Sequence, residues 1–120
     1  MTWLYSQSLG TISHDTEIVG EGYAGKELDC NNPWSETKKG YGPLPRGLYR
    51  VGPSYRHSKL GSVTMNLSPI GHNAHGRTAF RIHGDSRLRP GTASEGCIVL
   101  PLAIRQKIAD SNDKEIFVGY

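Results

Sequence analysis

Short runs of alternating hydrophobic and polar residues, separated by turn-forming residues, extend through most of the chain. Residues 2–8 (TWLYSQS) place Trp3 and Tyr5 on one side of an extended segment, and Gly10 supports a turn into residues 11–13. Because side chains alternate between the two faces of a strand, this stretch predicts the start of a β-hairpin. The same reasoning predicts further strands at residues 17–20, 48–51, 63–67, 77–83 and 115–118. The last of these is expected to return the chain to the sheet.

One segment in the second half has helical spacing. Pro101 suits the first turn of a helix, where its missing N–H would have no partner. A partly apolar face follows at Leu102, Ile104, Arg105, Ile108 and Ala109. This pattern predicts one helix from Pro101 to about Asp110.

The remaining segments are rich in turn formers. Residues 22–33 are predicted to form a polar loop that continues to Tyr41. Residues 42–47 (GPLPRG) contain two prolines separated by one residue, which excludes a helix. They are predicted to form either a stiff wall beside a cleft or an extended lead into the next strand.

Composition narrows the fold class to a mainly β domain. The 120 residues include 15 glycines and seven prolines, and 36% are hydrophobic, which suits one loop-rich domain over residues 1–120. The net charge of +3 favours anionic envelope polymers as partners but not nucleic acid. No apolar run is long enough to cross a membrane, and no signal peptide precedes the first strand, so we expect synthesis in the cytoplasm.

The chemistry is concentrated in residues 80–100 (FRIHGDSRLRPGTASEGCIVL). His83 ends a predicted strand, and Cys97 begins an apolar segment 14 residues later. A thiol reacts as its thiolate, and a neighbouring histidine favours that form and can later protonate a leaving amine. We therefore predict a cysteine nucleophile with a histidine base.

Residues next to the cysteine also suggest roles. Gly96 allows a carbonyl substrate close to the backbone, and the amides of Gly96 and Cys97 are predicted to stabilise an oxyanion. Glu95 is expected to face water, since a carboxylate beside a thiolate discourages ionisation.

Two other arrangements are less well supported. His72 and His75, together with His83 and Cys97, suggest a zinc site, but the segment is broken by glycines and lacks helical H-x-x-x-H spacing, so no metal is expected. Both histidines are predicted to lie in an exposed loop. Two cysteines form no disulfide framework, so Cys30 and Cys97 are predicted to be free thiols.

The HGD and SEGC motifs resemble the signature of YkuD-type L,D-transpeptidases, which process peptidoglycan stem peptides. The resemblance is closest to the L,D-transpeptidase-like toxins that bacteria deliver through type VI secretion. Two further stretches are similar to that branch: residues 22–25 (GYAG) and residues 42–49 (GPLPRGLY). Common YkuD members have a histidine where Glu95 stands, and an arginine soon after the cysteine.

The resemblance implies an L,D-transpeptidase-like fold, either a β-sandwich or a partly closed sheet, and acyl transfer without a cofactor. Cys97 would be the nucleophile, His83 the general base and acid, and Ser94 would orient the thiol or the substrate. Asp85 would shape the histidine loop, and Arg77 would face substrate carboxylates. Substrate contacts are expected at Tyr23, Arg77, Gly84 and Asp85.

The resemblance also implies partners and a place of action. The substrate would be the tetrapeptide stem of peptidoglycan, from which the enzyme would remove or exchange the terminal D-alanine. A secretion apparatus would carry the toxin to the periplasm of a target bacterium, and a cognate immunity protein would protect the producer.

Two alternatives remain open from the residues alone. A thiol endopeptidase of the NlpC/P60 kind is one, although those enzymes usually place the cysteine before the histidine. A peptidoglycan-binding module with an inert cysteine is the other. Selective alkylation of Cys97 relative to Cys30 would distinguish an activated thiol from a structural one.

Overall fold

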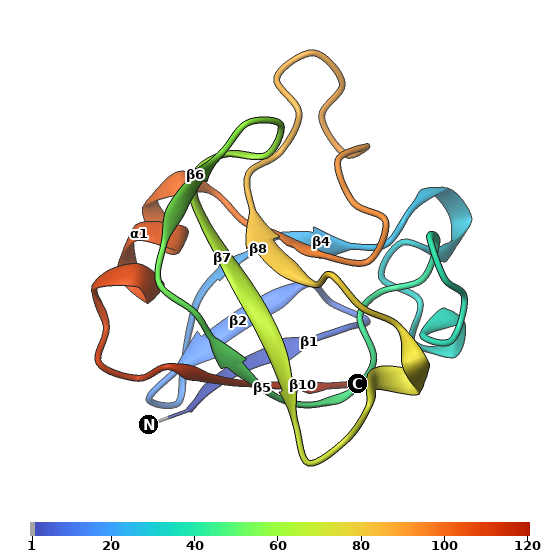
Figure 1. The fold of residues 1–120 in the computed structure, drawn as a ribbon, viewed down its shortest axis with the longest axis horizontal. Coiled ribbons are helices and arrows are strands. Elements are labelled where there is room, and N and C mark those ends of the chain that lie inside the picture. Colours follow the sequence, from blue (N-terminus) through green and yellow to red (C-terminus); the bar gives the residue numbers. More distant parts are fainter. Residues whose placement is uncertain (1) are drawn as a thin grey trace.

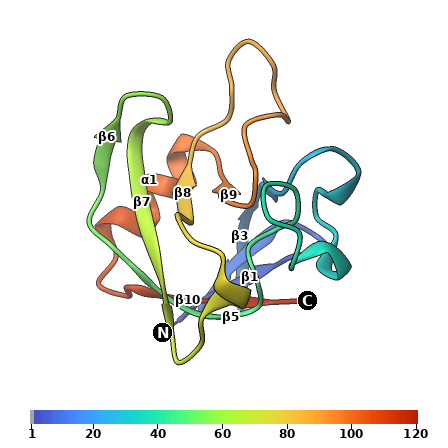
Figure 2. The same ribbon diagram turned by 45° about the vertical axis from the view of Figure 1, so that its right-hand side comes forward.

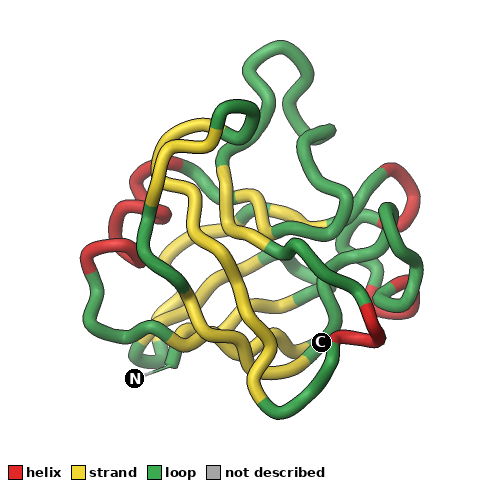
Figure 3. Tube along the Cα trace, viewed as in Figure 1, coloured by secondary structure: helices red, strands yellow, loops and turns green. Residues whose placement is uncertain are grey.

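The computed structural model describes residues 2–120, whose strands form one mixed, open sheet that curves around a common core (Figures 1 and 3). The strand order is β3-β2-β1-β10-β5-β7-β8-β9-β4, and β6 pairs with β7 outside this path. The strands are β1 (Trp3–Ser6), β2 (Thr11–His14), β3 (Glu17–Glu21), β4 (Tyr23–Ala24), β5 (Gly47–Val51), β6 (Tyr55–His57), β7 (Gly61–Ile70), β8 (Arg81–His83), β9 (Ile98–Val99) and β10 (Glu115–Gly119). Helix α1 spans Leu102–Asp110, and three 3₁₀ turns are η1 (Glu27–Asp29), η2 (Pro33–Ser35) and η3 (Ala74–Gly76). The predicted mainly β class with one helix is confirmed.

The two ends of the described chain meet in the middle of the sheet. Strand β1 pairs in parallel with β10, and β10 pairs antiparallel with β5. Strand β1 also pairs antiparallel with β2, which confirms the predicted hairpin. The return of the last strand to the sheet is confirmed as well.

Alternation along the strands builds the core, as the sequence pattern predicted. Trp3 and Tyr5 of β1 are buried while Leu4 between them is exposed. In β10, Ile116 and Val118 are buried while Phe117 is half-exposed. Helix α1 contributes Ile104 and Ile108 to the same core, together with a buried arginine, Arg105. In the described residues, no helix is long and apolar enough to span a membrane.

The strand predicted at residues 77–83 is shorter in the structure. Strand β8 includes only Arg81–His83, because Ala79 has a φ of 65°, in the left-handed region that interrupts an extended chain. Strand β7, in contrast, is longer than predicted. Strands β4 and β6 were not predicted, since two or three residues carry too little alternation to be recognised.

Residues 42–45 of the proline-containing segment are buried rather than forming only a lead into β5. The amide of Leu44 donates to the carbonyl of Gly96 (3.0 Å), which ties this segment to the loop that carries the cysteine. That loop, residues 84–97, stands out beyond β8 and β9 (Figure 2). The segment and the loop together frame the candidate site.

Candidate active site

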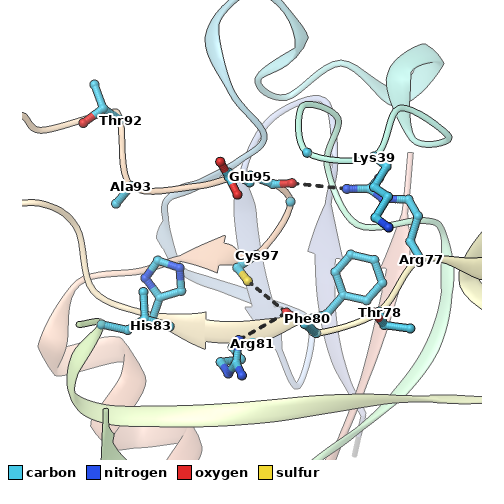
Figure 4. A pocket seen from close by; sticks show the side chains of 14 residues that line it. Lys39, Arg77, Thr78, Phe80, Arg81, His83, Thr92, Ala93, Glu95 and Cys97 are labelled. Atoms are coloured by element: carbon cyan, nitrogen blue, oxygen red, sulfur yellow. Dashed lines mark hydrogen bonds between the residues drawn. The ribbon is translucent and has the colours of Figure 1, made fainter. Parts of the chain in front are cut away.

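A cavity of about 490 Å³ lies beside strand β8 and the start of β9 (Figure 4). His83 and Cys97 both line it. Its wall also includes Lys39, Phe80, Arg81 and Thr92. The structure therefore brings the predicted nucleophile and base to one cavity, although they are 14 positions apart in the chain.

The sheet explains why these two residues meet. Strands β8 and β9 run parallel, with Ile82 opposite Ile98 and His83 opposite Val99. Continued by one residue, this register places Cys97 opposite Arg81, two positions before the histidine. Residues two apart on a strand share a face, so the thiol and the imidazole lie on the same side of the sheet.

His83 is buried, with 1% of its surface exposed, and its Nδ1 lies 2.7 Å from the carbonyl oxygen of Gly84. A carbonyl can only accept, so Nδ1 carries the proton and Nε2 is left with its lone pair. Burial lowers the pKa of His83. The Gly84 hydrogen bond and Asp85 oppose this shift, while Arg105 and Arg81 reinforce it. At neutral pH the imidazole is therefore uncharged and able to accept a proton.

The Cys97 thiol is also neutral at rest. Burial raises its pKa. A hydrogen bond from the backbone N–H of Arg81 partly offsets this shift, as do the positive charges of Arg81 and Arg77. Its Sγ donates to the carbonyl of Ala79 (3.6 Å), and among residues 2–120 no hydrogen bond joins it to His83. The lowered pKa of His83 and the raised pKa of Cys97 both favour a neutral thiol and imidazole over a thiolate–imidazolium pair at rest.

Ser94 holds the cysteine loop rather than the thiol. Its hydroxyl accepts from the amides of Gly25 (2.9 Å) and Gly96 (3.1 Å) and donates to the carbonyl of Cys97 (2.6 Å). These three contacts occupy the hydroxyl. They also correct the expectation for Gly96, whose amide is bound to Ser94 and is not free for an oxyanion.

Gly96 has a different structural reason to be glycine. Its φ of +143° lies in a region that side chains rarely adopt, and a Cβ there would lie 2.5 Å from Nη2 of Arg77. The residue thus lets a guanidinium approach the backbone. Arg77 therefore makes the close approach at Gly96 that the sequence predicts for a carbonyl substrate.

Arg77 lines the cavity, but it is buried, and backbone carbonyls engage the guanidinium that was expected to face substrate carboxylates. It is 6% exposed, and its guanidinium donates to four backbone carbonyls. These are the carbonyls of Glu36 (2.6 Å), Gly42 (2.9 Å), Pro43 (2.9 Å) and Glu95 (3.2 Å). It therefore fastens residues 36–43 to the cysteine loop.

Tyr23 and Asp85 join the two sides of the loop formed by residues 84–97. The Tyr23 hydroxyl donates to Oδ1 of Asp85 (2.6 Å) and accepts from the amide of Ala93 (2.9 Å). The Asp85 carboxylate also accepts from the amides of Ser86 (2.8 Å) and Gly91 (3.1 Å). These contacts fold the loop, and neither side chain lines the cavity.

Arg105 is a site residue that the sequence reasoning missed. From helix α1 it donates to the carbonyls of Leu100 (2.9 Å) and Ser62 (2.5 Å). A Cβ on Gly84 would lie 2.8 Å from Nη2 of Arg105, so a larger residue in the turn after His83 would displace the guanidinium. The sequence did hold a signal for this role, because Arg105 lies on the predicted apolar face of the helix, where a charged residue is unusual.

The other sequence-predicted residues lie apart from the cavity or at its edge. His75 is exposed and contacts Oε2 of Glu36 (3.0 Å), whereas half-buried His72 contacts the carbonyl of Leu48 (3.0 Å). Among residues 2–120, no three potential metal ligands cluster. Cys30 and Cys97 are both free, as predicted. Glu95 faces solvent, as predicted, 3.8 Å from Lys26.

A comparison with known protein families connects this geometry to a function. A family model described as the Tlde1 domain matches residues 19–115, most of the chain and all of the cavity wall. The chain belongs to the Tlde1 domain family. Tlde1 domains are type VI secretion effectors and L,D-transpeptidase-like toxins, which confirms the resemblance at the level of the family. No curated protein matches the chain.

Membership of the Tlde1 family carries further implications. It relates the protein to peptidoglycan and implies a secretion apparatus as a partner. It also indicates secretion into target cells.

Proposed function

We propose that this Tlde1 domain is a cysteine-dependent acyl transferase that acts on peptidoglycan stem peptides. It removes the terminal D-alanine of a tetrapeptide, as an L,D-carboxypeptidase, or exchanges it for another D-amino acid. The observation that carries the proposal is the shared cavity, where Cys97 lies beside a buried His83 whose Nε2 is free to accept a proton.

The reaction begins with two neutral groups. As Sγ of Cys97 attacks the carbonyl carbon before the terminal D-alanine, Nε2 of His83 accepts the thiol proton. The tetrahedral intermediate then loses the C–N bond, and the imidazolium gives its proton to the departing amine. D-alanine and a thioester are the products of this half.

A second acceptor completes the cycle. His83 takes a proton from water or from a D-amino acid amine, which attacks the thioester carbonyl. The C–S bond breaks, and the thiolate of Cys97 recovers the proton. Water gives a shortened tripeptide, a D-amino acid gives exchange, and the amine of a neighbouring stem gives a cross-link.

We assign stabilisation of the oxyanion to the amide of Cys97, because the Gly96 amide is bound to Ser94. Ser94 and Arg77 act by holding the loop that presents this amide and the thiol. Both are positioning residues.

In a target bacterium, the proposed reaction consumes the tetrapeptides that serve as cross-linking donors, so the enzyme acts in the periplasm as an antibacterial toxin. A producer exposed to its own toxin then requires an immunity protein. Copurification of one partner with the toxin from the producing strain is expected.

The test is mass spectrometry of disaccharide-tetrapeptide after incubation with the purified protein, with and without an added D-amino acid. Cys97→Ala and His83→Gln are expected to abolish loss and exchange of D-alanine, whereas Cys30→Ala retains both. An intact tetrapeptide with the wild-type protein overturns the proposal. Cleavage of cross-linked fragments instead would indicate an endopeptidase, and binding without any cleavage a peptidoglycan-binding module.

A further inference from the structure

Three cationic side chains line the cavity, and they differ in the hydrogen-bond and ion-pair partners that they already have. Arg77 is committed to four backbone carbonyls. Lys39 is exposed and lies across the cavity from His83 (Figure 4). Arg81 is half-buried, and among residues 2–120 no carboxylate lies within ion-pair distance of it.

Neutral contacts hold Arg81 in a defined orientation. Its Nε donates to the hydroxyl of Tyr55 (3.1 Å), and that hydroxyl donates to Oδ1 of Asn66 (2.5 Å). A long contact of 3.5 Å joins Nη1 to the carbonyl of Ala79. The guanidinium is thus anchored at one edge by strands β6 and β7, and Nη2 has no partner among the described residues.

Arg81 also lies next to the reacting atoms. The register of β8 and β9 places it opposite Cys97, and it is two residues from His83 on the same face. A half-buried guanidinium without a counter-ion is a site for an anion, since its charge is only partly solvated and its planar donors match a carboxylate.

We propose that Arg81 binds the free carboxylate of the D-amino acid that leaves, which rests on the proposed acyl transfer by Cys97. In a stem peptide, only the leaving nitrogen and one α-carbon separate that carboxylate from the scissile carbonyl carbon. An anion-binding residue beside the nucleophile therefore fits a substrate that ends one residue after the cleaved bond. Arg81 restricts the enzyme to free chain ends and disfavours the donor stems of cross-links, whose terminal carboxylate is already an amide.

The test compares two substrates, a tetrapeptide ending in D-alanine and the same peptide ending in D-alaninamide. The wild-type protein is expected to prefer the acid, and Arg81→Gln to reduce the ratio of kcat/KM for acid over amide on the order of 10- to 100-fold. Any effect of Arg81 on the thiol itself slows both substrates equally and cancels in this ratio.

Three further variants sharpen the result. Arg81→Lys keeps the charge without the planar fork, so an intermediate ratio is expected. Tyr55→Phe removes the anchor and is expected to reduce the ratio by a smaller factor. Arg87→Gln, in the exposed loop, should leave it unchanged and serves as the matched control.

Each outcome has a distinct meaning. An Arg81→Gln ratio equal to that of the folded wild type overturns the assignment of Arg81 while leaving acyl transfer intact. A wild-type protein that processes the acid and the amide equally also overturns it. Inactivity of the wild type on both substrates overturns the proposed function instead.

Discussion

At the scale of single residues, a backbone carbonyl sets the chemical state of the proposed base. Many catalytic histidines are oriented by a carboxylate, which stabilises the charged imidazolium. The carbonyl of Gly84 orients His83 with no full negative charge, and burial, reinforced by the nearby Arg105 and Arg81, lowers its pKa and disfavours a second proton. The residue is therefore suited to start the cycle as a neutral base.

This arrangement predicts a shifted pH dependence. Because the pKa of His83 lies below its ordinary value, the imidazole stays neutral as the pH falls through about 6.5. The acid limb of kcat/KM is therefore expected below pH 6.5, and ¹⁵N NMR of the imidazole should show a proton on Nδ1 at neutral pH. A limb at or above pH 6.5, or a proton on Nε2, contradicts the assignment. Spectra of His83→Gln identify the resonances.

Sequence patterns identified the proposed nucleophile and base but not the residues that hold them in place. His83 and Cys97 could be found because a strand end and an apolar run flank them. The roles of Ser94, Gly96 and Arg77 depend on hydrogen bonds to backbone groups far away in the chain, such as Arg77 with Pro43. No local pattern encodes such a contact, because any residue type at position 43 presents a carbonyl.

At the scale of elements, a network around Glu36 ties together segments that are far apart in the sequence. One carboxylate oxygen accepts from Nε2 of Gln7 (3.0 Å) and Nε of Arg46 (3.0 Å), and the other contacts His75 (3.0 Å). The end of β1, the lead into β5 and η3 therefore meet at one side chain. Together with Arg77, this network holds the frame of the cavity.

The network predicts a measurable acid sensitivity. Burial would raise the pKa of Glu36, but hydrogen bonds from Gln7, Arg46 and His75 outweigh it and lower the pKa to about 2. A pKa lower in the folded state stabilises the fold above the ordinary value of 4.5, and this stabilisation is lost as the pH falls towards 2. Glu36→Gln is therefore expected to reduce the free energy of unfolding by about 2 kcal/mol at pH 7.

Urea denaturation across pH measures this effect. The difference between wild type and Glu36→Gln should shrink steadily from about pH 5 towards pH 2. Glu21→Gln, at an exposed position of β3, is the matched control and should show little difference at any pH. If the difference in unfolding free energy between wild type and Glu36→Gln does not change with pH, packing of the side chain rather than its charge accounts for the difference.

Element prediction succeeded where burial alternates and failed where the backbone departs from regular geometry. Strands β1, β5 and β10 alternate between core and solvent, so their sequences reveal them. Strand β8 is truncated by the positive φ of Ala79, which alanine itself does not favour. Tertiary contacts, including the bond from the amide of Leu67 to the carbonyl of Phe80 (2.9 Å), accompany that conformation.

At the scale of the whole molecule, the fold depends on joining distant parts of the described chain. Strand β10 lies between β1 and β5, with Ile116 opposite both Trp3 and Tyr49. All three of these side chains are buried. The family match at residues 19–115 includes none of β1 or β2 and only the first residue of β10.

A fragment of residues 19–115 is therefore expected not to fold, although it contains Cys97, His83 and the cavity wall. It would lack Trp3, Tyr5, Ile116 and Val118, and burying one large apolar side chain stabilises a protein by roughly 2 kcal/mol. Four such losses, about 8 kcal/mol, approach the whole stability of a domain of this size. Circular dichroism with urea should show a cooperative transition for the full chain and none for the fragment. Full-length Phe117→Ala, which truncates a half-exposed side chain of the same strand, should keep the transition, and a cooperative, active fragment would show that the central strands are dispensable.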